Sequence, residues 1–197
     1  LHDADGGLEA ELAPPRTDLL VGLDLQYPEL LTVPAADGTA LQASILKPKG
    51  FDPARRHPVI LHVYGGPGAP RVADRWDGSL WFNQLLLKVG YVVAAIDNRS
   101  ATAASRTHET SVARRLWSDG ELVDLLAGVQ WLKAQPWVDP ERVGVWGWSG
   151  GGMFTLVALT RSKEFKAGIA VAPGTDWRYY DTRFTEAYMK PPAENPE

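Results

Sequence analysis

The stretch RVGVWGWSGGGMFTLVAL, residues 142–159, decides the fold of this chain. It opens with an apolar run of the kind that forms a buried strand and closes with apolar residues at helical spacing. Between the two lies GWSGG, residues 147–151, which fits the pattern G-x-S-x-G. Small residues around the serine let the chain turn sharply, so that the serine stands at the carboxyl end of the strand. We therefore interpret Ser149 as a candidate nucleophile.

A serine hydroxyl attacks a carbonyl only when a base removes its proton and donors receive the negative charge that develops on oxygen. At such a turn the backbone N–H of Gly150 faces the oxyanion, and the helix that begins near Gly151 adds the positive end of its dipole. Two other interpretations are a turn that only needs tight packing and a phosphate-binding loop. A phosphate loop requires Lys followed by Ser or Thr after the glycines, whereas Met153 and Phe154 stand there. The phosphate loop is therefore excluded.

Strands and helices are expected to alternate around this turn. Two β-type runs flank Asp37-Gly38, a pair that signals a hairpin. Ser118 and Glu121 form a capping box with apolar residues following at helical spacing, which predicts a helix over 118–133. The other expectations are buried strands over 59–64, 91–97, 142–148 and 166–173 and helices over 81–88 and 153–160. This order predicts an α/β fold with a mostly parallel sheet that follows an antiparallel opening.

Composition excludes several classes of function. The chain has no cysteine, so disulfides, thiol catalysis and zinc bound by cysteine are excluded. Its formal net charge is −4 and its Lys and Arg residues are scattered, which argues against nucleic acid or a membrane as the main partner. No cluster of His or carboxylate residues has the spacing of metal ligands, and neither a metal nor an organic cofactor is implied. The residues do not indicate the compartment.

Four motifs carry a family resemblance: GWSGGG, FKAGIAVAPGTDWRYYDTRFTEAYM, PVILHVYGGPG and QPWVDPERVGVWGWS. Together they resemble the catalytic domain of the dipeptidyl peptidase IV branch of the prolyl oligopeptidase family, serine peptidases with an α/β-hydrolase fold. The resemblance covers about residues 28–196. It implies that residues 1–27 are a linker or the tail of a preceding β-propeller domain. It also implies that residues 28–197 are a partial peptidase domain that stops before the last strands of the fold.

The resemblance implies a role for each matching residue. Ser149 would be the nucleophile, and the hydroxyl of Tyr64 would donate to the oxyanion beside the N–H of Gly150. Three aromatic residues would line the pocket for the residue before the scissile bond, which in this family prefers proline: Trp177, Tyr180 and Phe184. The alternative interpretation of these aromatic residues is packing in the core, and that of Tyr64 is a strand-end tyrosine.

The sequence departs from the family pattern around this pocket. Gly150 stands where the family usually has Tyr or Asn, and Gly174 stands where a larger apolar residue is usual. Both changes are expected to widen the pocket and relax a strict preference for proline. Phe184 replaces a usual tyrosine, and the loop that begins at Asp97 lacks the usual glycines.

The base and the acid of a catalytic triad are missing from the expected positions. In this fold they follow the serine in the order Ser, Asp or Glu, His. All four histidines precede Ser149: His2, His57, His62 and His108. We expect His62 to lie in a buried strand and His108 in a polar loop. The resemblance places Asp176 and Asp181 beside the substrate pocket, and the alternative interpretation gives them surface or capping roles. The 197-residue chain alone is therefore expected to be inactive.

The implied partners are a peptide substrate, the remainder of the catalytic domain and a β-propeller domain, and the family resemblance leaves room for a homodimer. A periplasmic or secreted location is suggested by the family only. Two alternatives stay open. One is another α/β-hydrolase activity, an endopeptidase or an esterase. The other is a non-catalytic fragment whose exposed sheet edge and eight tryptophans serve association.

Overall fold

A computed structural model of the chain describes residues 1–13, 16–75, 78–102 and 104–195. In these ranges six strands form one sheet in the order β1-β2-β4-β3-β5-β6. The strands β3, β4, β5 and β6 pair in parallel, while β1 and β2 are antiparallel to their neighbours. The strand bounds are β1 Glu29–Pro34, β2 Ala40–Leu46, β3 His57–His62, β4 Val92–Ile96, β5 Val138–Trp148 and β6 Ala167–Val171.

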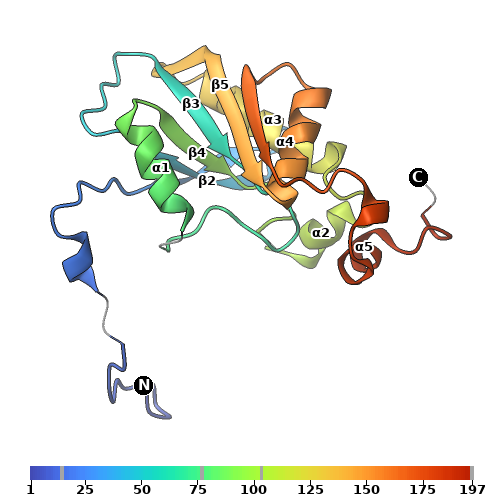
Figure 1. Cartoon of the computed structure of the whole chain (residues 1–197), viewed down its shortest axis with the longest axis horizontal. Helices are drawn as coiled ribbons and strands as arrows, with labels where there is room; N and C mark the ends of the chain where they lie inside the picture. Colours follow the sequence, from blue (N-terminus) through green and yellow to red (C-terminus); the bar gives the residue numbers. More distant parts are fainter. Residues whose placement is uncertain (14–15, 76–77, 103, 196–197) are drawn as a thin grey trace.

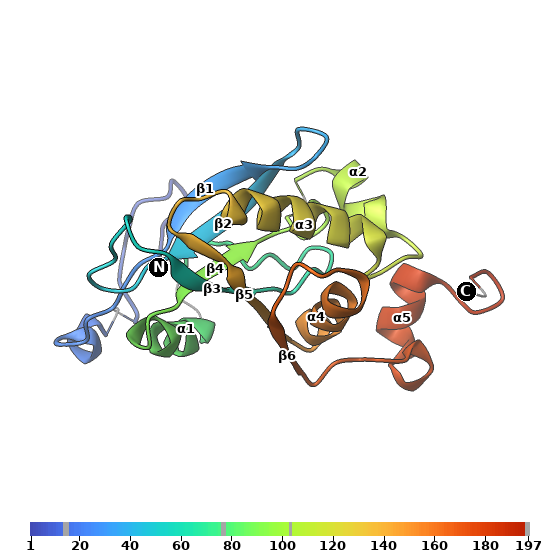
Figure 2. The ribbon, with the colours of Figure 1, turned by 90° about the horizontal axis from the view of Figure 1, so that it is seen from above.

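Helices cover both faces of this sheet. Figure 2 shows α1 on one face and α3 and α4 on the other. Within the described ranges no helix has the length and apolar character needed to cross a bilayer. The helices are α1 Ser79–Lys88, α2 Arg106–Glu109, α3 Asp119–Lys133, α4 Gly150–Arg161 and α5 Thr182–Met189, with short 3-10 helices η1 Thr17–Leu20, η2 Thr110–Val112 and η3 Trp177–Tyr179.

The predicted hairpin and the alternation of strands and helices are confirmed. Strands β1 and β2 pair with Pro34 opposite Ala40, and Gly38 in the turn has φ +84°, a value that glycine adopts without strain. The side chain of Asp37 accepts the N–H of Thr39 at 3.0 Å, which closes the turn. The fold is the expected α/β arrangement with an antiparallel opening.

The central strand β4 divides the core into two layers. All five of its residues are buried, because both faces of the strand are covered. Val92, Ala94 and Ile96 belong to the large apolar core that includes residues of α3 and α4, whereas Val93 packs with Leu46 and Leu87 beneath α1. The sheet therefore acts as a rigid platform whose carboxyl edge carries the loops after β3, β4 and β5.

Several predicted boundaries are wrong. β5 begins at Val138 rather than residue 142, because its first residue already pairs with His57 before a register shift. α4 begins at Gly150 rather than residue 153, since the turn into it is tighter than periodicity alone suggests. His108 lies in α2 rather than in a polar loop, because the Ser105 hydroxyl caps that short helix.

The segment before β1 has little regular structure where it is described. It holds one isolated bridge between His2 and Leu8 and the helix η1. Figure 1 shows it running away from the sheet. One contact ties its end to α1, because the backbone of Gln26 exchanges two hydrogen bonds with the amide of Gln84, at 3.0 and 2.7 Å.

Candidate active site

Ser149 stands at the turn between β5 and α4, at the carboxyl edge of the sheet. Its backbone has φ +56° and ψ −118°, a conformation that costs a non-glycine residue free energy and that is found mainly at functional sites. Two hydrogen bonds maintain it. The Ser149 N–H donates to the carbonyl oxygen of Val171 at 2.9 Å, and its own carbonyl oxygen accepts the N–H of Met153 at 3.0 Å. The half-buried serine is thus held in a strained position between β6 and the first turn of α4.

Close backbone contacts explain the glycines around the serine. A Cβ atom on Gly147 would lie 2.6 Å from the carbonyl oxygen of Val63, and one on Gly151 would overlap that same oxygen. A Cβ on Gly152 would lie 2.6 Å from the carbonyl oxygen of Val171. The first turn of α4 therefore packs closely against the ends of β3 and β6. Only glycine fits at residues 147, 151 and 152.

Tyr64 is the second residue after β3 and lies beside this turn. A Cβ on Gly151 would be 3.2 Å from the Cα of Tyr64, so the two backbones are in contact. The guanidinium carbon of Arg71 lies 5.6 Å from the centroid of the Tyr64 ring, within the range of a cation–π contact. Gly150 is buried at the start of α4, where its N–H is one of those that no intrahelical carbonyl satisfies. Both sequence-predicted oxyanion residues therefore adjoin the serine turn.

The structure brings the three predicted pocket aromatics together. The Trp177 and Tyr180 rings meet edge to face at 6.2 Å, as do those of Tyr180 and Phe184 at 5.6 Å. Trp177 and Phe184 lie nearly parallel at 6.4 Å. A groove between η3 and α5 borders Trp177 and Tyr180, and Ser149 is not among the residues that line it. That groove therefore does not reach Ser149, and Trp177 and Phe184 also pack against the apolar core.

Trp117 also belongs to this cluster, although the family motifs do not contain it. Its ring lies parallel to Trp177 at 5.5 Å and to Phe184 at 6.1 Å. Its indole N–H donates to the carbonyl oxygen of Tyr64 at 3.0 Å. The one signal in the sequence is its place before the helix cap, where an apolar residue often packs on Leu122. That signal predicts a packing role at the start of α3 and gives no reason to expect the site.

The expected widening at Gly150 is corrected by the structure. A Cβ on Gly150 would overlap Cζ2 of Trp117 and lie 2.9 Å from Cη2, so the indole already occupies the space of a side chain at 150. Gly174 differs, because a Cβ there would meet only Tyr180, at an ordinary 3.7 Å. Of the two departures from the family pattern, only the one at Gly174 leaves room.

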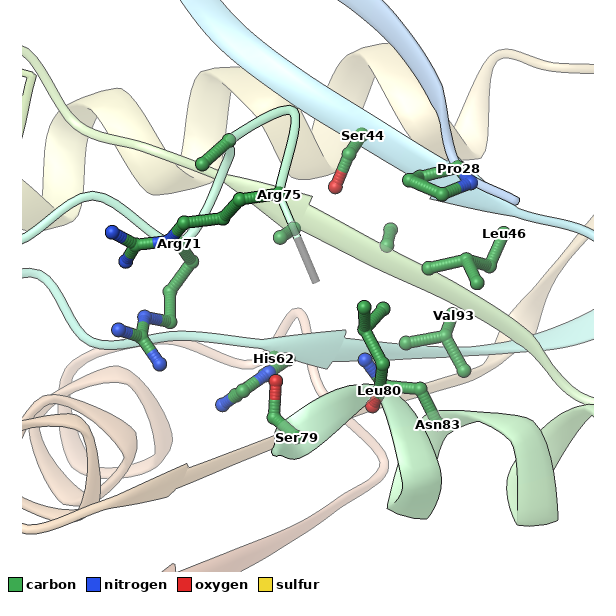
Figure 3. Close-up of a pocket in the computed structure, with 13 residues that line it drawn as sticks. Pro28, Ser44, Leu46, His62, Arg71, Arg75, Ser79, Leu80, Asn83 and Val93 are labelled. Carbon is green, nitrogen blue, oxygen red and sulfur yellow. The ribbon is translucent and has the colours of Figure 1, made fainter. Parts of the chain in front are cut away.

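The histidines make contacts elsewhere. His57 stacks on Phe51 at 4.7 Å, and its Nε2 lies 3.0 Å from the carbonyl oxygen of Asp52. His62 stacks on Trp146 at 4.2 Å and lines a small cavity on the α1 side of the sheet (Figure 3). His108 belongs to α2. None of these contacts includes Ser149.

Asp176 and Asp181, which follow the serine, cap two short helices. Asp176 accepts the N–H of Arg178 at 2.9 Å, and Asp181 accepts the N–H of Phe184 at 2.8 Å at the start of α5. These caps explain why the short helices η3 and α5 begin where they do. In the described part of the chain, no group of three or more His, Asp or Glu side chains could hold a metal ion.

Asp97 is a buried carboxylate that anchors the loop carrying Arg71. It follows β4, is 2% exposed, and accepts the N–H groups of Arg71 and Val72 at 2.8 and 2.9 Å. Burial raises the pKa of Asp97 to about 6, and the two hydrogen bonds oppose that shift. The carboxylate thus fixes the backbone from which Arg71 reaches the Tyr64 ring.

Comparison with known proteins agrees with this geometry. The sequence model of the prolyl oligopeptidase family matches residues 76–197. The probable dipeptidyl-aminopeptidase B of Emericella nidulans is 37% identical over 162 residues, which are 81% of this chain and 18% of the relative. Dipeptidyl peptidase 8 of Mus musculus is 37% identical over 175 residues, 87% of this chain and 20% of the relative.

A solved structure extends the comparison to the fold. The crystal structure of Porphyromonas gingivalis dipeptidyl peptidase 4 superposes with a TM-score of 0.82 at 38% identity, over 88% of this chain and 24% of that one. The chain thus spans about a fifth of the length of the curated relatives named above. It belongs to the prolyl oligopeptidase family, carries part of an α/β-hydrolase fold, and is similar to dipeptidyl peptidases over most of its own length.

Proposed function

We propose that this chain is the nucleophile-bearing part of a serine peptidase that releases dipeptides from peptide N-termini, after proline or a small residue. The observation that carries the proposal is the strained Ser149 at φ +56°, between a parallel strand and a helix that begins with an N–H of Gly150. A turn that only needed compact packing would have no reason to keep a serine in a conformation that favours glycine.

In the proposed reaction the Oγ of Ser149 forms a bond to the carbonyl carbon of the scissile peptide. The carbonyl π pair moves to oxygen, and the N–H of Gly150 and the hydroxyl of Tyr64 donate hydrogen bonds to this oxyanion. A base takes the serine proton and passes it to the leaving amine as the C–N bond breaks. Water then hydrolyses the ester on Ser149 and releases the dipeptide.

The base and its orienting acid are proposed to come from the remainder of the catalytic domain. Every histidine of this chain precedes Ser149, and His57, His62 and His108 are engaged elsewhere. The matched relatives are about five times longer than the match. We further propose that residues 1–27 link to a β-propeller domain and that residues 28–197 are a partial peptidase domain. A homodimer of the whole protein is compatible with this arrangement.

The aromatic cluster is proposed to receive the residue before the scissile bond. Trp177, Tyr180 and Phe184 form an apolar surface, which suits the flat ring of proline or the methyl group of alanine. The free space beside Gly174 supports acceptance of small residues other than proline.

The test compares two substrates and two serine variants in the full-length protein. We expect Gly-Pro 4-nitroanilide to be hydrolysed much faster than a short-chain nitrophenyl ester, and Ser149→Ala to abolish the peptidase activity. Ser162→Ala is the matched control, because the hydroxyl of Ser162 bonds the carbonyl oxygen of Ala158 at the far end of α4. An esterase that ignores the anilide would contradict the peptidase assignment. Normal turnover by the isolated 197-residue chain would contradict the proposal that the base lies outside it.

A further inference from the structure

Trp117 lies where the serine turn, the Tyr64 loop and the aromatic cluster meet. The edge of its indole occupies the space of a side chain at Gly150, and a Cβ on Gly66 would lie 3.4 Å from the same ring. Its N–H is bonded to the carbonyl oxygen of Tyr64 at 3.0 Å, and its face is parallel to that of Trp177. The Trp117 side chain therefore lies against Gly150, against the segment of Tyr64 and Gly66, and against Trp177 of the proposed pocket.

The backbone of Trp117 is held in a position that packing alone does not require. Its φ is +49°, in the left-handed region that bulky residues rarely adopt. The carboxylate of Glu121 stabilises this conformation, because one oxygen accepts the Trp117 N–H at 2.7 Å and the other accepts the Ser118 N–H at 2.9 Å. Glu121 is 1% exposed, so the anchor of Trp117 is itself fixed in the core.

The pairing of Trp117 with Gly150 explains both unusual residues. Glycine at 150 is required because any Cβ there would overlap the indole. Conversely, Gly150 has no side chain, so removal of the indole would leave a cavity beside Ser149. Trp117 is 6% exposed and its ring fills this space. The side of the proposed pocket next to Ser149 is thus closed by Trp117, which directly precedes the N-cap of α3.

We propose that Trp117 is a specificity-determining residue, which closes the pocket on the side of the nucleophile and restricts the residue before the scissile bond to proline or alanine. This inference rests on the proposed peptidase function. The indole occupies the space beside Gly150, whereas a Cβ on Gly174 would make only ordinary contacts with Tyr180, at 3.7 Å or more. Without the indole, the space beside Gly150 becomes continuous with the pocket and admits a branched side chain such as that of leucine.

The first experiment measures kcat/KM of the full-length protein on Gly-Pro, Gly-Ala and Gly-Leu 4-nitroanilides. Trp117→Gly suits the left-handed backbone and removes the ring. We expect the ratio of Gly-Leu to Gly-Pro turnover to rise at least about tenfold, the scale of discrimination by apolar pockets. Trp117→Phe should give a smaller rise. Trp137→Gly is the matched control. That indole packs on Phe51 at the amino end of β5, so its removal should not change the ratio.

If Trp117 has a purely structural role, its replacement lowers kcat/KM for all three substrates by the same factor. The ratio of Gly-Leu to Gly-Pro turnover then stays unchanged, which would overturn the proposal. Because Trp117→Gly could fail to fold, the ratio in Trp117→Phe provides a second reading. If the unchanged protein hydrolyses no dipeptide anilide, the proposed function fails. If it does and the ratio does not respond to either variant, only the role of Trp117 fails.

A second experiment tests the pairing itself. Gly150→Ala should strongly reduce Gly-Pro hydrolysis in the natural background, because the new methyl group overlaps the indole. In the Trp117→Gly background the same change should cost little, since its clash partner is gone. An equal loss in both backgrounds would show that the two residues do not compete for one space.

Discussion

The backbone N–H of Ser149 donates a 2.9 Å hydrogen bond to the carbonyl oxygen of Val171, which ties the serine turn to the end of β6. The same carbonyl oxygen would lie 2.6 Å from a Cβ on Gly152. Ser149 and Gly152 thus depend on the end of β6, whereas Gly147 and Gly151 lie against the carbonyl oxygen of Val63. The geometry of the serine turn is therefore a property of the parallel sheet as much as of the GWSGG motif.

Gly151→Ala is predicted to destabilise the catalytic domain. The added methyl group would overlap the carbonyl oxygen of Val63, a backbone atom that cannot move without shifting β3. Overpacking of this kind costs about 1–3 kcal/mol. Thermal unfolding of the full-length protein measures the loss. Gly174→Ala is the control for stability, because its methyl group would make an ordinary contact at 3.7 Å. Equal midpoints for the two variants would contradict the close approach of α4 and β3.

Tyr64→Phe is predicted to lower kcat with little change in KM. The phenol hydroxyl is proposed to donate only to the oxyanion, and loss of one such donor costs about 10²- to 10³-fold in kcat. Steady-state kinetics on Gly-Pro 4-nitroanilide measure both constants. Tyr27→Phe is a matched control, since Tyr27 is 72% exposed in the segment before β1. A rise in KM alone would instead indicate that Tyr64 stabilises the bound substrate and the transition state equally.

Asp97→Asn is predicted to change how stability depends on pH. The pKa of Asp97 is raised to about 6 by burial, from an ordinary value of roughly 4. A raised pKa means that the stabilising contribution is complete below pH 4 and is lost as the pH rises through about 6. The stability of the natural protein relative to Asp97→Asn should therefore fall between pH 4 and pH 7, by on the order of 3 kcal/mol. A difference that is independent of pH would contradict a raised pKa in the folded state.

Asp124→Ala is predicted to be strongly destabilising. The Asp124 side chain is 1% exposed and accepts the backbone N–H, Nε and Nη2 of Arg99 at 2.7 to 2.9 Å. The Arg99 side chain is itself 25% exposed and keeps its Nη1 bond to Asp37 at 2.8 Å, so the cost should lie above about 1 kcal/mol but below the about 3–5 kcal/mol of a fully buried pair. Arg161→Ala breaks the exposed pair with Asp119 and should cost less than about 1 kcal/mol. Denaturant unfolding of both variants gives the comparison, and similar losses would contradict it.

Local patterns predict the elements of this fold well. The hairpin at Asp37-Gly38 follows from turn chemistry, and the helix that Ser118 caps follows from a reciprocal pair of hydrogen bonds within four residues. Buried strands such as β4 are uniformly apolar because both of their faces are covered. Each of these signals is carried by residues that are close in the sequence.

The contacts of the candidate site are harder to predict from the sequence, because they join segments that are far apart in the chain. Trp117 and Gly150 share one space, yet no periodicity relates a residue before α3 to one after β5. The grouping of Trp177, Tyr180 and Phe184 came from the family motif, since short helices capped by Asp176 and Asp181 give no long periodic pattern. The widening expected at Gly150 was wrong for the same reason, because the side chain that fills the space comes from elsewhere in the chain.

The most direct test of the central claim is the intact mass of the full-length protein after treatment with a fluorophosphonate probe, followed by peptide mapping of the adduct. We expect one adduct, on the peptide that contains Ser149, and none on Ser149→Ala. We also expect no adduct on the isolated 21.5 kDa chain, which lacks a histidine after the serine. An adduct that persists in Ser149→Ala, or a full-length protein that hydrolyses Gly-Pro 4-nitroanilide without labelling at Ser149, would contradict the assignment of Ser149 as the nucleophile.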